Sequence, residues 1–406
     1  MQSTRVASGN AESSRAWLVL LGSGLGIFSG AASVAYYTFG IFLPEIISDT
    51  RWSGREVAAA IGPALVAVAL VAPLAGSAID KFGSRTIVLI GAPAAAIGFA
   101  IVGLVPTTSS GFAIAMTALF LLYFAGSPMP YARLVAAWFG KRQGMALGVM
   151  FAFGSFGIAF WPLYAARLIN QYGWRRAYVV IGITVASIFL LTAVFLLKDP
   201  PKTVILEQSS SASSLSVREA IRKSRFWKLA AIFLVITAVI GGAAVVFPVI
   251  LRMRHADSQT SATIMAVIGF GMFAGRLAMG PLLDRFYSPT LTICVTSVAL
   301  LSFAITAWTS SVHALFVAAG FLGLSLGSEY AVAAYMTLRC FGLGSFGSIY
   351  GLILAATSLG GAAGPAILGA ALVSGIEVST ICFSAMAVLV IPLVLLKSFH
   401  RKDFCF

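Results

Sequence analysis

The sequence predicts an all-α membrane protein with twelve transmembrane helices, arranged as two pseudo-symmetric six-helix bundles. Of its 406 residues, 59% are hydrophobic and only 10% are charged, and the mean hydropathy is +0.97. A soluble domain carries about 25% charged residues, so the composition excludes a soluble enzyme with a single anchor. Apolar blocks of about 20 residues, each long enough to cross a bilayer, recur from one end of the chain to the other.

Short polar loops separate the predicted spans. We expect the spans at residues 16–43, 56–79, 85–106, 111–137, 143–168, 175–197, 227–251, 262–284, 289–309, 312–338, 346–372 and 378–397.

The longest polar gap, Lys198 to Arg225, divides the spans six and six. Its basic end, Val217 to Trp227, is expected to form a short helix on the membrane surface. The predicted organisation is an N-terminal tail, an N-terminal bundle, a linker, a C-terminal bundle and a C-terminal tail, at 1–15, 16–197, 198–226, 227–397 and 398–406.

The basic residues predict the orientation. The formal net charge is +14, and most Lys and Arg lie in short loops between apolar segments. With a cytoplasmic N-terminus, 18 of the 27 face the cytoplasm, which agrees with the positive-inside rule. We therefore expect both termini in the cytoplasm of a bacterial cell, a location in its cytoplasmic membrane, and no binding of nucleic acid.

The two halves repeat a motif after equivalent spans. The matching pairs, at offsets of about 203 residues, are Gly76 and Gly280, Asp80 and Asp284, Gly144 and Gly347, and Gly148 and Gly351. Two related halves around a site at the membrane midplane are typical of one large class of secondary transporters.

The segment Gly76-x3-Asp80-Lys81-Phe82-Gly83-Ser84-Arg85 resembles the loop signature of the major facilitator superfamily. Within that family, segments 39–46, 52–57 and 138–148 are similar to the monocarboxylate porters and oxalate/formate antiporters. The resemblance implies that the major facilitator fold is present and that Arg276 lies at the substrate-binding position of the eighth span. It also implies a gating role for Gly76, Asp80, Lys81, Gly83, Arg85, Gly280, Asp284 and Arg285.

Three positions depart from those families. Tyr37 stands where the porters carry a lysine, Met272 stands where they carry an acid, and the eleventh span has no Lys or Arg, unlike that of the antiporters. A doubly charged substrate is therefore not expected, because one buried cation balances one negative charge.

Arg276 interrupts an apolar span about 12 Å from its cytoplasmic end. A charge at the bilayer centre costs about 2.5–3.5 kcal/mol on insertion scales, so such a residue faces a bundle interior or a cavity. Its guanidinium keeps its proton and matches a carboxylate. We predict that Arg276 binds the substrate; the alternative is a structural arginine tied to helix carbonyls or to Glu329.

Glu329 is the only acidic residue predicted well inside a span. A low dielectric favours the neutral form of a carboxylic acid, while a nearby cation favours the charged form. We predict that Glu329 carries a proton and that its protonation frees Arg276 for the substrate. A fixed ion pair with Arg276 and a direct contact between Glu329 and the substrate remain as alternatives.

Further candidates come from the cavity-facing spans. Tyr37, Tyr123 and Tyr330 are expected to orient a carboxylate while their rings contact an apolar tail. Arg133 is expected to reach the membrane interface or to contact an inner gate. The stretch Gly154-x2-Gly157 indicates a close contact between helices.

The motifs of other function classes are absent from the sequence. Its four cysteines and three histidines have no metal-ligand spacing, and the loop Gly-x4-Gly-Lys-Ser/Thr does not occur. We expect no metal, no cofactor and no enzyme activity. The predicted function is symport of a small monocarboxylate with a proton, by alternating access in a monomer. Exchange of one carboxylate for another, and a membrane sensor that binds without transport, remain as alternatives.

Overall fold

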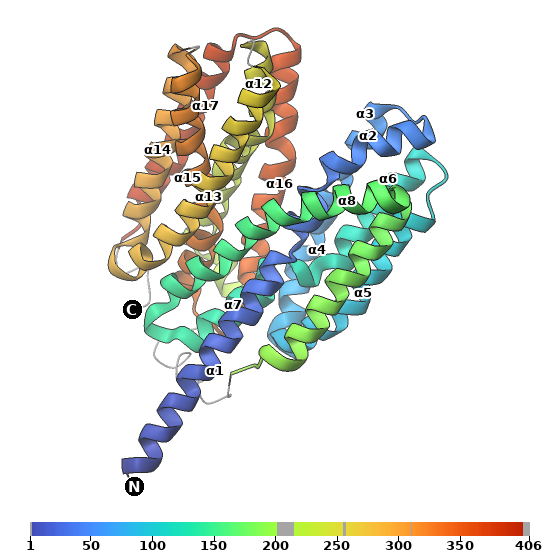
Figure 1. The fold of residues 1–406 in the computed structure, drawn as a ribbon. Helices are drawn as coiled ribbons and strands as arrows, with labels where there is room; N and C mark the ends of the chain where they lie inside the picture. Colours follow the sequence, from blue (N-terminus) through green and yellow to red (C-terminus); the bar gives the residue numbers. More distant parts are fainter. Residues whose placement is uncertain (1, 201–214, 255–256, 310, 401–406) are drawn as a thin grey trace.

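The computed structural model describes residues 2–200, 215–254, 257–309 and 311–400. Within these residues the chain is almost entirely helical and contains no β-strand. Figure 1 shows two bundles, one built from the first half of the chain (blue to green) and one from the second (yellow to red). The bundles diverge towards the ends that carry α3 and α12.

The first half contains α1 (Gln2–Phe28), η1 (Ala32–Tyr36), α2 (Phe39–Thr50), α3 (Gly54–Ala59), α4 (Ile61–Phe82), α5 (Ser84–Leu104), α6 (Ser109–Leu122), η2 (Tyr123–Gly126), α7 (Pro128–Phe139), η3 (Gly140–Arg142), α8 (Gln143–Leu191) and η4 (Thr192–Leu196). The second half contains α10 (Val217–Arg222), α11 (Ser224–Ile236), η5 (Thr237–Gly241), α12 (Gly242–Met253), α13 (Ser258–Arg285), α14 (Ser288–Trp308), α15 (Val312–Phe341), α16 (Phe346–Val373) and α17 (Val378–Lys397).

Eleven stretches of the described chain are long and apolar enough to cross a membrane. One of them, Gln143–Leu196, has 54 residues, which would extend about 80 Å as a straight helix. The hydrocarbon core of a bilayer is only about 30 Å thick. The backbone leaves helical geometry at Gly173, with φ +75°, a conformation that glycine adopts readily. This stretch therefore crosses twice, and the predicted twelve-helix class is confirmed.

Several helix boundaries differ from the predicted ones by a few residues or more, and two of the differences concern the ends of predicted domains. Helix α1 is already helical at Gln2, so residues predicted as a tail continue directly into the first span. Helix α11 begins at Ser224, before the predicted start of the second bundle.

The predicted short helix of the linker is present as α10, and a capping box of Ser216 and Glu219 starts it. Residues 201–214 of the predicted linker lie outside the described residues, as do residues 401–406 of the predicted C-terminal tail. The positions of the domain boundaries and the contact of α10 with a membrane surface remain predictions.

The first membrane span of each half contains one π-helical turn. These turns, η1 and η5, lie at matching positions of the sequence repeat. Such turns inside α-helices are rare and frequently mark functional sites. Each one brings a hydroxyl into the interior, Ser33 in η1 and Thr237 in η5, and both side chains are buried.

Glycines of the sequence repeat lie where the halves cross. Helix α4 packs on α16, and α13 packs on α8. A Cβ atom added to Gly347 would lie 2.6 Å from the carbonyl oxygen of Gly76, and one added to Gly144 would lie 2.6 Å from that of Gly280. No side chain fits at such distances, so these crossings require glycine. The glycine after the second span of one half thus packs against the glycine at the start of the fifth span of the other half, in both directions.

Candidate functional site

Two carboxylates bind helix starts across the interface between the halves. At the end of α4, Asp80 accepts hydrogen bonds from the backbone N–H groups of Gly347 (2.9 Å) and Ser348 (2.8 Å), and from the Ser348 hydroxyl (2.8 Å). At the end of α13, Asp284 accepts hydrogen bonds from the N–H groups of Gly144 (2.7 Å) and Met145 (2.8 Å). Each carboxylate thus meets the positive end of a helix in the other half.

Arg133 lies beside the first of these contacts. Its side chain is buried and forms an ion pair with Asp80, with 3.4 Å between Nε and Oδ1. Arg133 thus contacts an aspartate of the loop signature, and its role at an inner gate remains a prediction.

The basic residues of the first loop signature contact their own half. Arg85 donates to the carbonyl oxygen of Ala193 (2.8 Å), and the Lys81 ammonium lies 5.2 Å from the centre of the Phe82 ring. Gly83 ends α4 with φ +84°, which suits glycine. Arg285, at the end of α13, is exposed. The two aspartates, rather than the basic residues, therefore join the halves at this end.

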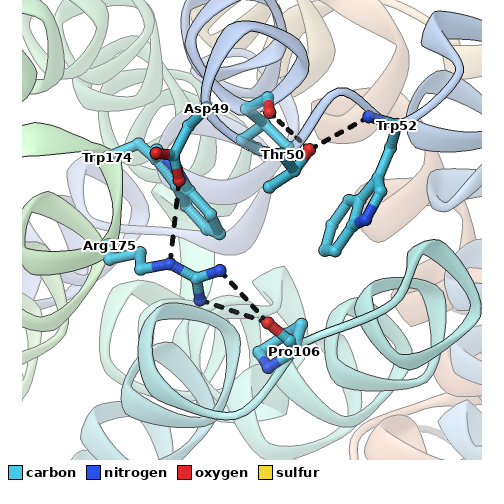
Figure 2. A network of polar contacts seen from close by, with 7 residues as sticks. Asp49, Thr50, Trp52, Pro106, Trp174 and Arg175 are labelled. Atoms are coloured by element: carbon cyan, nitrogen blue, oxygen red, sulfur yellow. Dashed lines mark hydrogen bonds and ion pairs between the residues drawn. The ribbon is translucent and has the colours of Figure 1, made fainter.

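The opposite end of the first half is tied internally, as Figure 2 shows. Asp49 accepts a hydrogen bond from the Trp174 indole (2.9 Å) and pairs with Arg175 at 3.9 Å. Arg175 also donates to the carbonyl oxygen of Pro106 (3.2 Å). In the second half, Arg254 bonds to the carbonyl oxygens of Thr306 and Thr309.

These contacts stay within one half. Among the described residues, no hydrogen bond or ion pair joins the two halves at this end, in contrast to the Asp80 and Asp284 end.

Arg276 lies in the middle of α13 and faces the first half. Its side chain is buried, with 6% of the residue surface exposed. Nη1 donates to the Ser155 hydroxyl (2.9 Å) and to the carbonyl oxygen of Phe151 (3.2 Å), both on α8. No described carboxylate lies within 4 Å of the guanidinium. An ion pair between Arg276 and Glu329 is therefore not present.

The other edge of the guanidinium has no hydrogen-bond partner among the described residues. Nε is buried without a hydrogen-bond partner, and no described residue accepts a hydrogen bond from Nη2. Nε and Nη2 form the planar edge that takes both oxygens of a carboxylate. A buried polar group without a partner costs about 1–3 kcal/mol, and more when it is charged. The chemistry of this edge therefore favours an anionic partner.

Two of the predicted tyrosines flank this group. Tyr37 and Tyr330 lie close enough to interact electrostatically with the guanidinium, and they come from opposite halves. Tyr37 is 38% exposed. The Tyr330 ring packs 6.0 Å from the Phe151 ring, whose carbonyl group accepts from Arg276. Arg276, Tyr37 and Tyr330 thus form one cluster between the halves.

Tyr123 does not join this cluster. It is fully buried, its hydroxyl donates to the carbonyl oxygen of Ser29, and its ring lies 5.2 Å from that of Phe99. All of these partners belong to the first half, so Tyr123 packs the first bundle.

Glu329 faces a different neighbour from Arg276. Its side chain is 4% exposed, and Oε1 forms a hydrogen bond with the hydroxyl of Thr237 in η5. Oε2 is buried and has no hydrogen-bond partner. Tyr37 and Tyr330 lie within electrostatic range of Glu329 as well as of Arg276.

Sequence reasoning missed the groups that hold Arg276. Ser155 and the Phe151 carbonyl group orient the guanidinium, and Gly154 makes room for it, because a Cβ at Gly154 would lie 3.1 Å from Nη1. The only signal was the glycine-rich stretch that contains Ser155. Thr237, the partner of Glu329, carried no sequence signal at all.

Residues 25–365 match the family model of the Major Facilitator Superfamily. The chain is 23% identical over 355 residues to the uncharacterized MFS-type transporter YhjX of Escherichia coli, with 85% of each chain covered. It is 25% identical over 360 residues to monocarboxylate transporter 11 of Mus musculus, covering 82% of this chain and 76% of the relative. The fold is similar to that of the proton:xylose symporter XylE, with a TM-score of 0.77, 14% identity and 96% of each chain covered.

Proposed function

Because the chain belongs to the Major Facilitator Superfamily, a family of transporters, we propose that this integral membrane protein carries a small organic monocarboxylate together with a proton. The observation that supports this proposal most directly is the buried Nε and Nη2 edge of Arg276, which has no hydrogen-bond partner among the described residues. The similarity to monocarboxylate transporter 11 agrees with a carboxylate substrate.

In the proposed complex the substrate carboxylate binds the Nε and Nη2 edge of Arg276. Ser155 and the Phe151 carbonyl oxygen hold Nη1, so the guanidinium is oriented before the substrate arrives. Preorganised groups lose less conformational freedom on binding. The hydroxyls of Tyr37 and Tyr330 donate to the carboxylate from opposite halves, and a single positive charge selects a single carboxylate.

The proposed proton carrier is Glu329, and Thr237 accommodates both of its forms. The Thr237 hydroxyl has one hydrogen and two nearby acceptors, Glu329 Oε1 and the carbonyl oxygen of Phe233 (2.7 Å). When Glu329 is ionised, Thr237 donates to it. When Glu329 is protonated, it can donate to Thr237, which then donates to Phe233. The proposed proton-binding site therefore does not include Arg276. Tyr37 and Tyr330, which lie within electrostatic range of both Glu329 and Arg276, would couple proton binding to substrate binding.

The arrangement of the halves fits one state of alternating access. Under the predicted orientation, the Asp80 and Asp284 contacts close the cytoplasmic end, while the other end lacks polar contacts between the halves in the described residues. We propose that this state accepts substrate from outside. Release to the cytoplasm then requires both aspartates to leave the starts of α16 and α8.

The test is uptake of radiolabelled monocarboxylates into proteoliposomes with an imposed proton gradient. Arg276→Lys keeps the charge but loses the planar edge, which removes one charged hydrogen bond of about 1.5–3 kcal/mol. We expect kcat/KM to fall by roughly ten- to 150-fold. Arg254→Lys is the matched control, because Arg254 also binds two carbonyl oxygens but lies outside the site.

Uptake by Arg276→Lys at the wild-type rate would refute the anion-binding role. Uptake that requires carboxylate inside the vesicles, and not a proton gradient, would establish exchange. Binding of a carboxylate without uptake or counterflow would establish a sensor.

A further inference from the structure

A basic pocket lies at the start of the second bundle, outside the candidate functional site. It is lined by Lys223, by Ser224, Arg225 and Lys228 of α11, and by Phe399, which follows α17. Its volume is about 280 Å³, which is room for several water molecules. Three of the five lining residues are basic and none is acidic. The pocket therefore suits an anion.

The start of α11 brings these polar groups to one place. Residues three and four apart lie on the same face of an α-helix, with about 5–6 Å between their Cβ atoms. Arg225 and Lys228 are three apart in α11, Ser224 and Lys228 are four apart, and Lys223 directly precedes the helix. Two ammonium groups, a guanidinium and a hydroxyl thus line the same pocket, and all four can donate hydrogen bonds.

Aromatic rings position two of the cations. The Lys228 ammonium lies 5.9 Å from the centre of the Phe399 ring, and the Arg225 guanidinium lies 5.2 Å from that of Phe341. Both rings are buried. A ring attracts a cation through its quadrupole but adds no net negative charge. These contacts therefore fix where the positive charges lie without neutralising them.

The described residues around the pocket carry more positive than negative charge. Neither described ion pair includes Lys223 or Lys228. Glu219 lies within electrostatic range of Lys223, but its carboxylate is bound to Ser216, where it caps α10. It is the one acid in the segment 216–228, which holds five basic residues, namely Arg218, Arg222, Lys223, Arg225 and Lys228.

The pocket lies where the second bundle meets the membrane surface. The apolar stretch Ser224–Met253 begins here and the apolar stretch Val378–Lys397 ends here. Trp227, next to Lys228, is 61% exposed, and tryptophan is enriched at membrane–water interfaces. Clusters of about four to eight Lys and Arg directly before a span are typical of segments that bind anionic lipids on the cytoplasmic side. Under the predicted orientation, the pocket lies on that side.

We propose that this pocket binds the phosphate group of an anionic phospholipid. Lys223, Arg225 and Lys228 donate to the phosphate oxygens, and the acyl chains extend into the bilayer beside Trp227. Because the lining comes from the start of the first span and the end of the last span of the second bundle, the lipid joins these two ends. This site is independent of the proposed substrate and of the proposed proton carrier.

The test uses purified full-length protein in a neutral detergent, titrated with short-chain phosphatidylglycerol, short-chain phosphatidylcholine or glycerol phosphate. Phosphatidylcholine carries a compensating positive charge, and glycerol phosphate carries the phosphate without acyl chains. We expect the Tm to rise with phosphatidylglycerol until it saturates, because a ligand that binds only the folded state stabilises it. The other two should have little effect. Native mass spectrometry should find one phosphatidylglycerol molecule retained per protein.

Three variants sharpen the test. Lys223→Gln and Lys228→Gln each remove one positive charge from the lining and are expected to weaken phosphatidylglycerol binding by roughly fivefold, the effect of one basic residue near an anionic membrane surface. Lys223 is exposed, so its replacement tests the charge without a change in packing. Lys397→Gln is the matched control, because Lys397 is exposed at the end of α17 but does not line the pocket.

The outcomes identify the occupant. Equal Tm curves in phosphatidylglycerol and phosphatidylcholine, or equal effects of the three variants, overturn the lipid site. A rise with glycerol phosphate as large as that with phosphatidylglycerol assigns the pocket to a free phosphate ester and overturns the lipid as its occupant. Selective phosphatidylglycerol binding that Lys223→Gln and Lys228→Gln weaken and Lys397→Gln leaves unchanged supports the site, even if carboxylate uptake proves independent of Arg276.

Discussion

The two aspartates that cap helices across the interface give the sharpest prediction about the conformational cycle. Replacing Asp80 or Asp284 by Asn keeps the size of the side chain but removes its charge and one acceptor oxygen. In each case the lost contact is made to the N-terminus of a helix in the other half. We expect either substitution to shift the protein towards a state that is open at this end.

The size of this shift follows from the bonds. Asp284 accepts two backbone hydrogen bonds, at 2.7 and 2.8 Å. Hydrogen bonds to charged groups contribute about 1.5–3 kcal/mol each, and Asn keeps one of the two. The equilibrium between closed and open should therefore move by a factor of roughly 10 to 150. Asp80 has a third bond and an ion pair with Arg133, so Asp80→Asn should act at least as strongly.

The assay measures the separation of the halves directly. Phe82 ends α4 and Phe286 follows α13; both are exposed and occupy matching places in the repeat. Spin labels on cysteines at these two positions, in a background without the native cysteines, report the distance by pulsed electron resonance. We expect a longer distance to appear in Asp80→Asn and Asp284→Asn.

Asp199→Asn is the matched control. Asp199 also accepts a backbone hydrogen bond, from Ser84 at 3.0 Å, but this contact does not reach the second half. A distance distribution that stays the same in all three variants would show that the caps do not hold this end closed. A change in Asp199→Asn as large as in the other two would show the same.

The remaining predictions concern glycines and the groups that orient Arg276. Gly154→Ala places a methyl group 3.1 Å from Arg276 Nη1 and should raise KM for the carboxylate severalfold with little change in kcat, whereas Gly269→Ala, with open space around it, should change neither. Ser155→Ala removes one hydrogen bond to the guanidinium, of about 1.5–3 kcal/mol, and should lower kcat/KM by at least tenfold in the same uptake assay; an unchanged value would argue against its orienting role. Gly347→Ala puts a methyl group 2.6 Å from the Gly76 carbonyl oxygen and should open the Asp80 end in the distance measurement, while Gly369→Ala on the same helix, which meets nothing within 4 Å, should leave the distances unchanged.

The membrane class could be predicted from the sequence because hydropathy alone defines the spans. The repeat also predicted which glycines and aspartates correspond, and the structure adds that they meet in crossed pairs. The aspartate of each half binds the start of a helix in the other half. This contact exists only once the two halves are assembled, so the sequence repeat alone does not predict it.

The relation between Arg276 and Glu329 could not be predicted from the sequence. Their helices, α13 and α15, pack closely together, yet Arg276 faces α8 and Glu329 faces η5. The rotation of a helix about its axis depends on its crossing with neighbours, and at α13 this is set by Gly271 and Gly275 against α15. The contacts of Ser155 with Arg276 and of Thr237 with Glu329 could not be predicted for the same reason. A hydroxyl residue in a membrane span does not indicate which charged side chain it will contact.

Arg276 belongs to one half, yet the oxygens that hold Nη1 belong to the other. In the proposed alternating-access cycle, the guanidinium would move with α13 while Ser155 and the Phe151 carbonyl group stay with α8. The proposed substrate would then be bound tightly only while the two bundles are aligned at this depth, and more weakly as they move apart. Substrate binding and release would then both follow from one rigid-body motion of the halves, and no additional residue would be needed to displace the substrate.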